Sequence, residues 1–340
     1  MAERISNVSV LSICRYITTI ANLLREFSHL VWVGYYFGIM KVIRSGLIIS
    51  PEMLSLNDGS NINGPCCIKV PDWCENKLGN YYLYFAHHSG KYIRMAYADK
   101  LNGPWTEYKD GVLNIEGLID AHDHIASPDI FIDYQRKELR MYFHSPSYKK
   151  QEQWTFLATS NNGLVYSQYG SSPLAPFYLR IIHYNNLFYG MSKGGNIWFS
   201  ESGLDSFSPL HNPFNRLLDH EIWHNSAGSV RHVALYRLDK ILYIFFSKIG
   251  DSPEKILCGT INLSIPREEW KVTNIVTVAK PEMEYEGVHI QGKPSKAGTA
   301  HKEENALRDP FIFEDNNKLY MFYCVKGECG IALSELKMDI

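Results

Sequence analysis

Two aspartates stand beside prolines, in positions where strand starts could bring carboxylates together. Asp129 closes the segment Ser127-Pro128-Asp129, and Asp309 lies inside Arg308-Asp309-Pro310. Two carboxyl groups can share the roles of general acid and general base, or one can act as a nucleophile. The neighbouring arginine would keep Asp309 ionised, as a base requires. The alternative is that both aspartates only cap β-turns.

Histidines form the second group with chemical potential. Imidazole exchanges protons near neutral pH, so a histidine beside a carboxylate is a candidate acid or base. His124 and His232 adjoin the same kind of segment as the aspartates, and we include both among the candidate catalytic residues. A histidine of this kind can equally be a hydrogen-bonded core residue.

The sequence also offers a candidate for a third catalytic carboxylate and an alternative metal site. Glu286, in Tyr285-Glu286-Gly287, lies in a long connection at about residues 273–305, and such connections often serve function. A divalent ion held by His122 and His124 with a nearby aspartate is an alternative. No recognised zinc spacing is present, so neither a metal nor another cofactor is predicted.

Polar and aromatic side chains near these segments are candidates for binding a substrate. They are Asn63, His87, His88, Tyr178, Arg180, Trp223, Arg231 and Arg308. Aromatic rings can stack on a sugar face, although they can equally be packing residues. Three arginines are more positive charge than a neutral sugar needs, so an acidic or sulfated sugar is one option.

The elements that must position these residues are short β-strands in five groups. Each group has a hydrophobic strand after polar residues, a tight turn, an aromatic-rich strand and a strand with small residues. The aromatic-rich strands begin near Tyr81, Leu139, Leu187, Ile241 and Leu319. Five recurrences of such a unit predict radially stacked blades, hence an all-β, five-bladed β-propeller. A two-sheet sandwich is the alternative.

The propeller predicts where the site lies, because the first strand of each blade lines the channel. The five first strands start at Asn63-Gly64-Pro65, Ser127-Pro128-Asp129, Tyr178-Leu179-Arg180, Arg231-His232 and Arg308-Asp309-Pro310. They carry more charged residues than turns require, so we expect them to form a pocket at the channel mouth. On this basis Asp129 and Asp309 are near-equivalents in the repeat.

The N-terminal segment differs in pattern from the strand-rich remainder of the chain. Residues 1–45 are predicted to be an apolar, helical extension, and residues 46–340 the propeller. A membrane-associating helix and a poorly ordered extension are the alternatives. The last blade lacks one strand, and Leu47-Ile48-Ile49 is strand-like, so we expect this segment to complete it.

Composition excludes several classes of protein. The formal net charge of −2 gives no electrostatic reason to expect a nucleic-acid partner. The chain has no dinucleotide-binding, P-loop, nucleophile-elbow or zincin motif. The seven cysteines lack a Cys-x-x-Cys pair, which favours a reducing, cytoplasmic location without disulfides. No uncharged run is long enough for a membrane span, so we predict no membrane partner.

Several stretches resemble a known superfamily. They are Asn61-Ile-Asn-Gly-Pro65, Tyr81-Tyr-Leu-Tyr-Phe-Ala-His-His88, Asp123-His-Ile-Ala-Ser-Pro-Asp129, Val230-Arg-His232, Phe246-Ser-Lys-Ile-Gly-Asp251 and Leu307-Arg-Asp-Pro-Phe-Ile-Phe313. The chain resembles the five-bladed β-propeller glycoside hydrolases of families 43, 32, 68 and 117, and more specifically a group of uncharacterised bacterial glycosidase-like proteins. The resemblance covers about residues 45–340.

The resemblance implies a glycosidase-like enzyme with an oligosaccharide or small-molecule substrate. The hydrolases use a carboxylate from each of the first three blades, and Asp129 matches the second of these positions. Asn63 replaces the first aspartate, and the third blade shows Tyr178 and Arg180 without an obvious glutamate. These departures keep two alternatives open. One is a lyase or transferase using histidine and tyrosine, and the other is a non-catalytic carbohydrate-binding propeller.

Overall fold

Antiparallel sheets, one for each predicted strand group, make up the chain. The structure, a computed structural model, describes residues 40–55, 61–214 and 228–338. Blade 1 contains β2 (Asn63–Lys69), β3 (Tyr81–Ala86), β4 (Tyr92–Ala98) and β5 (Thr106–Asn114). Blade 2 contains β6 (Ala126–Asp133), β7 (Glu138–Pro146), β8 (Gln153–Ser160), β9 (Ser167–Gln168) and β10 (Ala175–Pro176). Blade 3 contains β11 (Arg180–Tyr184), β12 (Leu187–Met191), β13 (Ile197–Ser200) and β14 (Ser208–Pro209).

The last two blades complete the ring. Blade 4 contains β15 (Val230–Leu238), β16 (Ile241–Lys248), β17 (Ile256–Asn262) and β18 (Thr273–Ala279). Blade 5 contains β19 (Arg308–Asp315), β20 (Lys318–Cys324), β21 (Ile331–Met338) and β1 (Met40–Ile49). Short 3-10 turns lie between strands: η1 (Pro51–Met53), η3 (Lys193–Gly195), η4 (Arg267–Glu269) and η5 (Glu284–Glu286).

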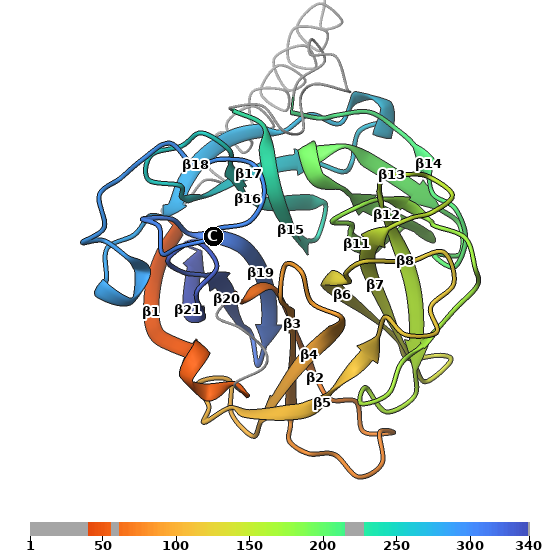
Figure 1. The fold of residues 1–340 in the computed structure, drawn as a ribbon. Helices are drawn as coiled ribbons and strands as arrows, with labels where there is room; N and C mark the ends of the chain where they lie inside the picture. Colours follow the sequence, from red (N-terminus) through yellow and green to blue (C-terminus); the bar gives the residue numbers. More distant parts are fainter. Residues whose placement is uncertain (1–39, 56–60, 215–227, 339–340) are drawn as a thin grey trace, which may run out of the picture. The chain divides into compact units, whose positions relative to one another are not determined.

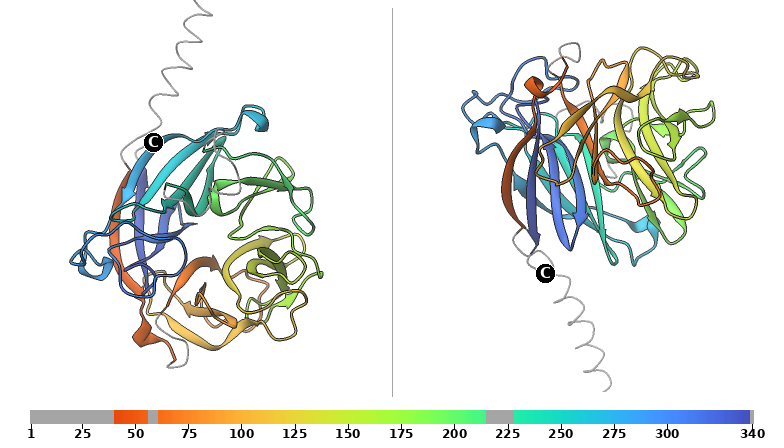
Figure 2. Two further views of the ribbon diagram at one scale, coloured as in Figure 1. Left: turned by 45° about the horizontal axis from the view of Figure 1, so that its top comes forward. Right: turned by 90° about the horizontal axis from the view of Figure 1, so that it is seen from below.

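The blades surround a central axis with their first strands innermost (Figures 1 and 2). Contacts between first strands run from β2 to β6, β11, β15 and β19, and from β19 back to β2. This closed ring is a five-bladed propeller, as predicted, and not a two-sheet sandwich. The predicted starts of the first strands are confirmed, because each lies within two residues of the observed start.

Blade 5 is closed by the N-terminal strand. β1 lies on the outer side of β21, although the two are far apart in sequence (Figure 1). Ile48 and Ile49 are buried there, which confirms that this segment completes the last blade. β1 starts at Met40, five residues before the predicted propeller boundary. Residues 1–39 lie outside the described residues, so the helical extension stays a prediction.

The hydrophobic core is divided among the interfaces between blades. One cluster joins Tyr82 and Tyr84 of blade 1 to Met141 and Phe156 of blade 2, and further clusters lie between other neighbours. A four-stranded sheet has two faces to bury, and each face packs on an adjacent blade. This arrangement explains why β3 is buried at every position.

A β-bulge lies at the start of four first strands. The pairing register shifts between Asn63 and Cys66, and at the corresponding places in β6, β15 and β19. In three of these bulges the second residue has a positive φ: Gly64, Ser127 and Asp309. The bulges align Asp309 with Ser127, and Asp129 with Phe311. The predicted near-equivalence of the two aspartates is therefore wrong by two positions.

The strand meander brings two sets of residues to one face of the propeller. Antiparallel order places the start of each first strand beside the turn that joins the second and third strands. The predicted connection at about residues 273–305 is partly wrong, because Thr273–Ala279 is strand β18, the fourth strand of blade 4. The remaining connection, residues 280–307, lies on the same face.

Candidate active site

An imidazole–carboxylate pair joins blades 4 and 5 at the channel mouth. Nδ1 of His232 contacts Oδ1 of Asp309, and both residues are almost fully buried. Oδ2 of Asp309 accepts a hydrogen bond of 3.0 Å from the backbone N–H of Gly64 in blade 1. The left-handed φ of 47° at Asp309 turns its side chain out of the regular strand pattern, as bulges do beside active sites.

Burial decides the protonation state of His232. Desolvation, with the positive charge of Arg231, holds the pKa of His232 well below its ordinary value. The imidazole is therefore neutral at pH 7, so one of its two ring nitrogens carries no proton. With Nδ1 at the carboxylate, Nε2 is the nitrogen left for exchange with a substrate.

Aromatic and imidazole rings continue from this pair around the channel. The Tyr178 ring lies 4.1 Å from that of His232 and 4.5 Å from that of His144, between centroids. His144 lies 6.0 Å from His124, which lies 6.4 Å from His88. We call these five residues with Asp309 the mouth ring, to which all five blades contribute.

Unpartnered nitrogens mark the blade-2 part of the mouth ring. Nδ1 of His144 and Nε2 of His124 are buried without a hydrogen-bond partner among the described residues. Burial lowers the pKa of both histidines, although Asp123, whose Oδ2 lies 2.9 Å from Nδ1 of His124, partly offsets it there. Buried polar atoms usually have partners, so these nitrogens are available to a ligand.

Asp129 is committed to a different partner. Its Oδ1 pairs with Arg180 at 3.1 Å, and its Oδ2 accepts the N–H of Ile181 at 2.8 Å. Burial raises the pKa of Asp129, and the charge of Arg180 offsets part of this rise. Arg180 also donates to the carbonyls of Pro128 and Pro65. Asp129 and Arg180 thus connect blades 1, 2 and 3.

The other two arginines belong to a buried ion network. Nε of Arg231 lies 2.7 Å from Oε1 of Glu254, and Nε of Arg308 lies 2.9 Å from Oε2 of the same glutamate. Arg308 also pairs with Glu304 and, at 3.5 Å, with Glu328. The prediction of an anionic sugar depended on unpaired arginines. The structure pairs all three with carboxylates, so they provide no spare positive charge.

Glu328 connects this network to blade 1. Its Oε2 lies 3.5 Å from Nδ1 of His88 and accepts from Asn61 at 2.6 Å. Burial alone would raise the pKa of Glu328, but His88, Arg308 and Asn61 hold it below its ordinary value. Asn63 donates to Asn61 at 2.9 Å. His88 is therefore oriented by a carboxylate, as His232 is.

The remaining predicted residues lie elsewhere. Glu286 is fully buried and bonds to Arg44 of β1, the Tyr323 hydroxyl and the backbone N–H groups of residues 282 and 283. These contacts stabilise the η5 turn against blade 5 and do not join Glu286 to the mouth ring. His87 lies beside His88, and its pKa is lowered by burial. Trp223 lies outside the described residues.

Sequence reasoning missed a second set of mouth residues. The turns between second and third strands deliver Lys193, Glu254 and Glu328, as well as the predicted His88. Burial, with the charge of Arg231, lowers the pKa of Lys193 to about 8. The sequence did contain a signal for them, since successive strand groups carry a charged residue in the turn between their second and third strands. In an antiparallel meander this turn lies at the same end of the blade as the start of the first strand, and therefore at the mouth.

The alternative of a metal site finds no support among the described residues, whereas most of the segment for which a membrane-associating helix was the alternative, residues 1–39, lies outside them. His122 stacks on Tyr148 at 4.0 Å between ring centroids. Across residues 40–55, 61–214 and 228–338, no group of three or more histidine, cysteine or acidic side chains could hold an ion. Within the same ranges, no helix has the length and apolarity to cross a bilayer.

Comparison with known proteins places the chain in a family. The uncharacterized protein R118 of Acanthamoeba polyphaga mimivirus is 33% identical over 310 residues, which cover 83% of this chain and 85% of that protein. The chain belongs to the same family as this viral protein. No family model matches the chain.

Solved structures confirm the propeller fold. CoXyl43, a family 43 β-xylosidase/α-arabinofuranosidase from a compost microbial metagenome, was solved with xylotriose and has a TM-score of 0.58. It is 13% identical, over 86% of this chain and 94% of its own. The endo-arabinase of Bacteroides thetaiotaomicron is 12% identical, with a TM-score of 0.55, over 82% of this chain and 95% of its own. At such low identity, these structural similarities show only that the chain shares its fold with these two proteins.

Proposed function

We propose that the protein is an enzyme that cleaves a glycosidic bond at the channel mouth, with His232 and Asp309 transferring the proton. The observation that carries the proposal is the contact between the neutral, buried imidazole of His232 and the carboxylate of Asp309. The shared fold supports a carbohydrate substrate. The paired arginines favour a neutral sugar over an anionic one.

The proposed reaction needs one proton donor and one proton acceptor. Hydrolysis protonates the leaving glycosidic oxygen, breaks the bond between that oxygen and the anomeric carbon, and adds water to that carbon. We assign removal of the proton from water to Nε2 of His232, while Asp309 holds the tautomer and stabilises the imidazolium. His88, oriented by Glu328, is positioned to protonate the leaving oxygen.

Tyr178 favours a second candidate. Burial raises the pKa of Tyr178, so its hydroxyl stays protonated and can donate a hydrogen bond beside His232. Both oxygens of Asp129 are occupied, so Asp129 does not serve as a second free carboxylate. This arrangement supports a lyase or transferase that uses histidine and tyrosine. Product analysis separates the classes, because a lyase forms an unsaturated sugar and a transferase a new glycoside.

The test is a screen of aryl glycosides and of xylo- and arabino-oligosaccharides, followed by substitution of Asp309. Asp309→Asn keeps the shape and tolerates the left-handed φ, but it removes the charge beside His232. We expect turnover to fall about 10²–10⁴-fold with the fold retained. Asp315→Asn, at the far end of β19, is the matched control. Near-normal turnover by Asp309→Asn would overturn the assignment.

A further inference from the structure

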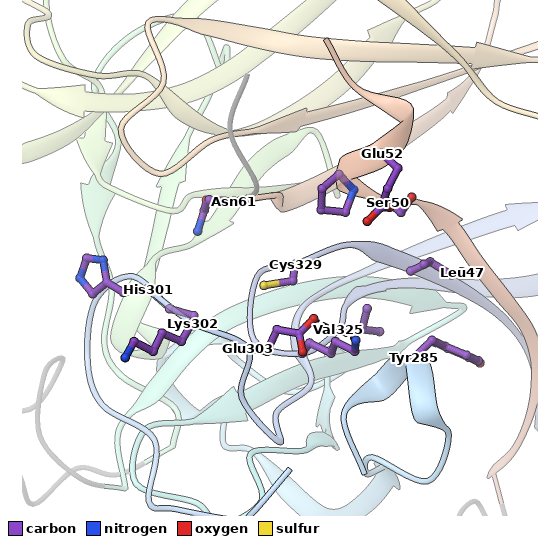
Figure 3. Close-up of a pocket in the computed structure, with 13 residues that line it drawn as sticks. Leu47, Ser50, Glu52, Asn61, Tyr285, His301, Lys302, Glu303, Val325 and Cys329 are labelled. Atoms are coloured by element: carbon purple, nitrogen blue, oxygen red, sulfur yellow. Dashed lines mark hydrogen bonds and ion pairs between the residues drawn. The ribbon is translucent and has the colours of Figure 1, made fainter. Parts of the chain in front are cut away.

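A pocket of about 460 Å³ lies beside the mouth ring and is not part of the site described above. Figure 3 shows its walls: the end of β1 with η1, Asn61, the connection before β19, and the turn between β20 and β21. Its volume falls within the range of about 300–1,000 Å³ typical of small-ligand sites. We call it the side pocket.

The side pocket and the mouth ring share their walls. Asn61 lines the pocket and accepts the backbone N–H of His88 at 2.9 Å. Cys329 lines the pocket, whereas the preceding Glu328 contacts His88. Adjacent residues therefore serve both sites, which places the side pocket next to the mouth ring at Asn61.

The connection that forms one wall of the side pocket is attached to the buried ion network. Glu303 lines the side pocket, and the next residue, Glu304, pairs with Arg308. The backbone N–H of Glu304 also donates to the carbonyl of Lys326 at 3.1 Å. This part of the connection lies outside the blade sheets, and these contacts hold it beside the mouth ring.

The charges of the lining favour a neutral ligand. Two lysines and two glutamates line the side pocket, Lys302, Lys326, Glu52 and Glu303, so their formal charges cancel. Lys326 pairs with Glu303 at 2.9 Å. Such a lining offers many donors and acceptors without net charge, which suits a ligand rich in hydroxyl groups.

We propose that the side pocket binds a second sugar unit of an oligosaccharide whose reacting unit lies in the mouth ring. The inference rests on the proposed function and adds a preference for longer substrates. The ligand class is a neutral saccharide. Lys302 and Glu303 bind its hydroxyl groups, and Asn61 lies between the two units.

The first test compares substrates of different length. We take the ratio of kcat/KM for xylotriose or arabinotriose to kcat/KM for the matching aryl monoglycoside. Lys302→Ala should lower this ratio about tenfold, on the scale of lost hydrogen bonds to a charged group. Lys293→Ala removes an exposed lysine of the same connection outside the pocket and should leave the ratio unchanged.

The outcomes separate the two proposals. An unchanged ratio in Lys302→Ala, with the monoglycoside still turned over, overturns the side-pocket inference and leaves the proposed function standing. If the protein neither binds nor turns over any saccharide, both are overturned.

The second test reads occupancy without catalysis. Cys329 is partly exposed in the side pocket, and burial raises the pKa of its thiol, so we follow its alkylation by iodoacetamide at mildly alkaline pH by mass spectrometry of its peptide. We expect xylotriose or arabinotriose to slow this alkylation in the Asp309→Asn protein, and the monosaccharide to have little effect. Equal rates with and without the trisaccharides would contradict the inference.

Discussion

Asp129 and Asp309 have the same side chain but different environments, and this difference separates their roles. Asp309 contacts a neutral imidazole, whereas Asp129 neutralises a buried guanidinium. In a buried ion pair, the attraction between the two charges roughly offsets the free energy of desolvating them. Removing one partner leaves the other charge buried and uncompensated. We therefore assign structural importance to Asp129 and chemical importance to Asp309.

Asp129→Asn should destabilise the protein by about 3–5 kcal/mol, because Arg180 loses its only carboxylate partner among the described residues. Urea unfolding measures this change. In a double-mutant cycle, the protein that carries both Asp129→Asn and Arg180→Met should be destabilised by less than the sum of the two single changes. Additive costs would show that the pair is not coupled.

The buried histidines predict how stability depends on pH. His124, His144 and His232 have folded-state pKa values below the unfolded value, so the unfolded state binds more protons once the pH falls below about 6.5. Stability should therefore decrease as the pH falls below that value. Each such histidine contributes up to about 1.4 kcal/mol per pH unit.

Urea midpoints between neutral and mildly acidic pH test this dependence. His144→Asn should reduce the slope of stability against pH, because it removes one of the three groups. His289→Asn, at an exposed histidine outside the ring, is the control and should leave the slope unchanged. A slope that is equal in wild type and His144→Asn would contradict the prediction.

At the scale of elements, the strand that completes blade 5 comes from the other end of the chain. β1 buries Ile48 and Ile49 and pairs Arg44 with the buried Glu286 at 2.8 Å. It also covers the edge of β21, and an uncovered strand edge is a template for aggregation. β1 therefore contributes both core burial and edge protection.

Truncation tests this contribution. Deleting residues 1–39 should leave a folded propeller, whereas deleting residues 1–50 should lower the thermal midpoint and promote aggregation. Scanning calorimetry and light scattering measure the two effects. Glu286→Gln in the full chain provides a milder comparison, because it weakens the contact with Arg44 and keeps β1. Equal midpoints for the two truncated proteins would rule out the role of β1.

At the scale of the whole molecule, buried ion pairs join neighbouring blades. Hydrophobic packing is non-directional, so it would not by itself fix how two blades are aligned at the mouth. Glu254 lies between Arg231 of blade 4 and Arg308 of blade 5, and Arg308 continues to Glu328. Glu254 of blade 4 compensates one charge from each of the two blades, whereas Arg308 and Glu328 both belong to blade 5. The network therefore fixes how the starts of β15 and β19 lie around the mouth.

Glu254→Gln should destabilise the propeller by about 3–5 kcal/mol, because two buried guanidinium groups lose their shared charge. Glu282→Gln is the control. Its carboxylate is half exposed and pairs with Arg44 at 3.1 Å, a kind of ion pair worth about 0–1 kcal/mol. Comparable losses in the two variants would show that the buried network has no special role.

The sequence by itself determined the five strand groups, the starts of the first strands and the missing strand of blade 5. The alternation of hydrophobic and polar residues along a strand is a local signal, and so are the residues typical of turns. Both can be recognised over a few positions. The same signals indicated that Asp309, His232 and Tyr178 would gather at the mouth. They missed β18, because its first five residues are all exposed and show no alternation of buried and exposed positions.

Only the tertiary structure decided which groups pair at the mouth. Gly64 and Asp309 are 245 positions apart, and Arg180 and Asp129 come from different blades. Such pairings depend on bulge register and on the angle between blades, which arise from packing across every interface of the ring. For this reason the sequence suggested free arginines and equivalent aspartates, whereas the folded chain pairs the arginines and separates the roles of the aspartates.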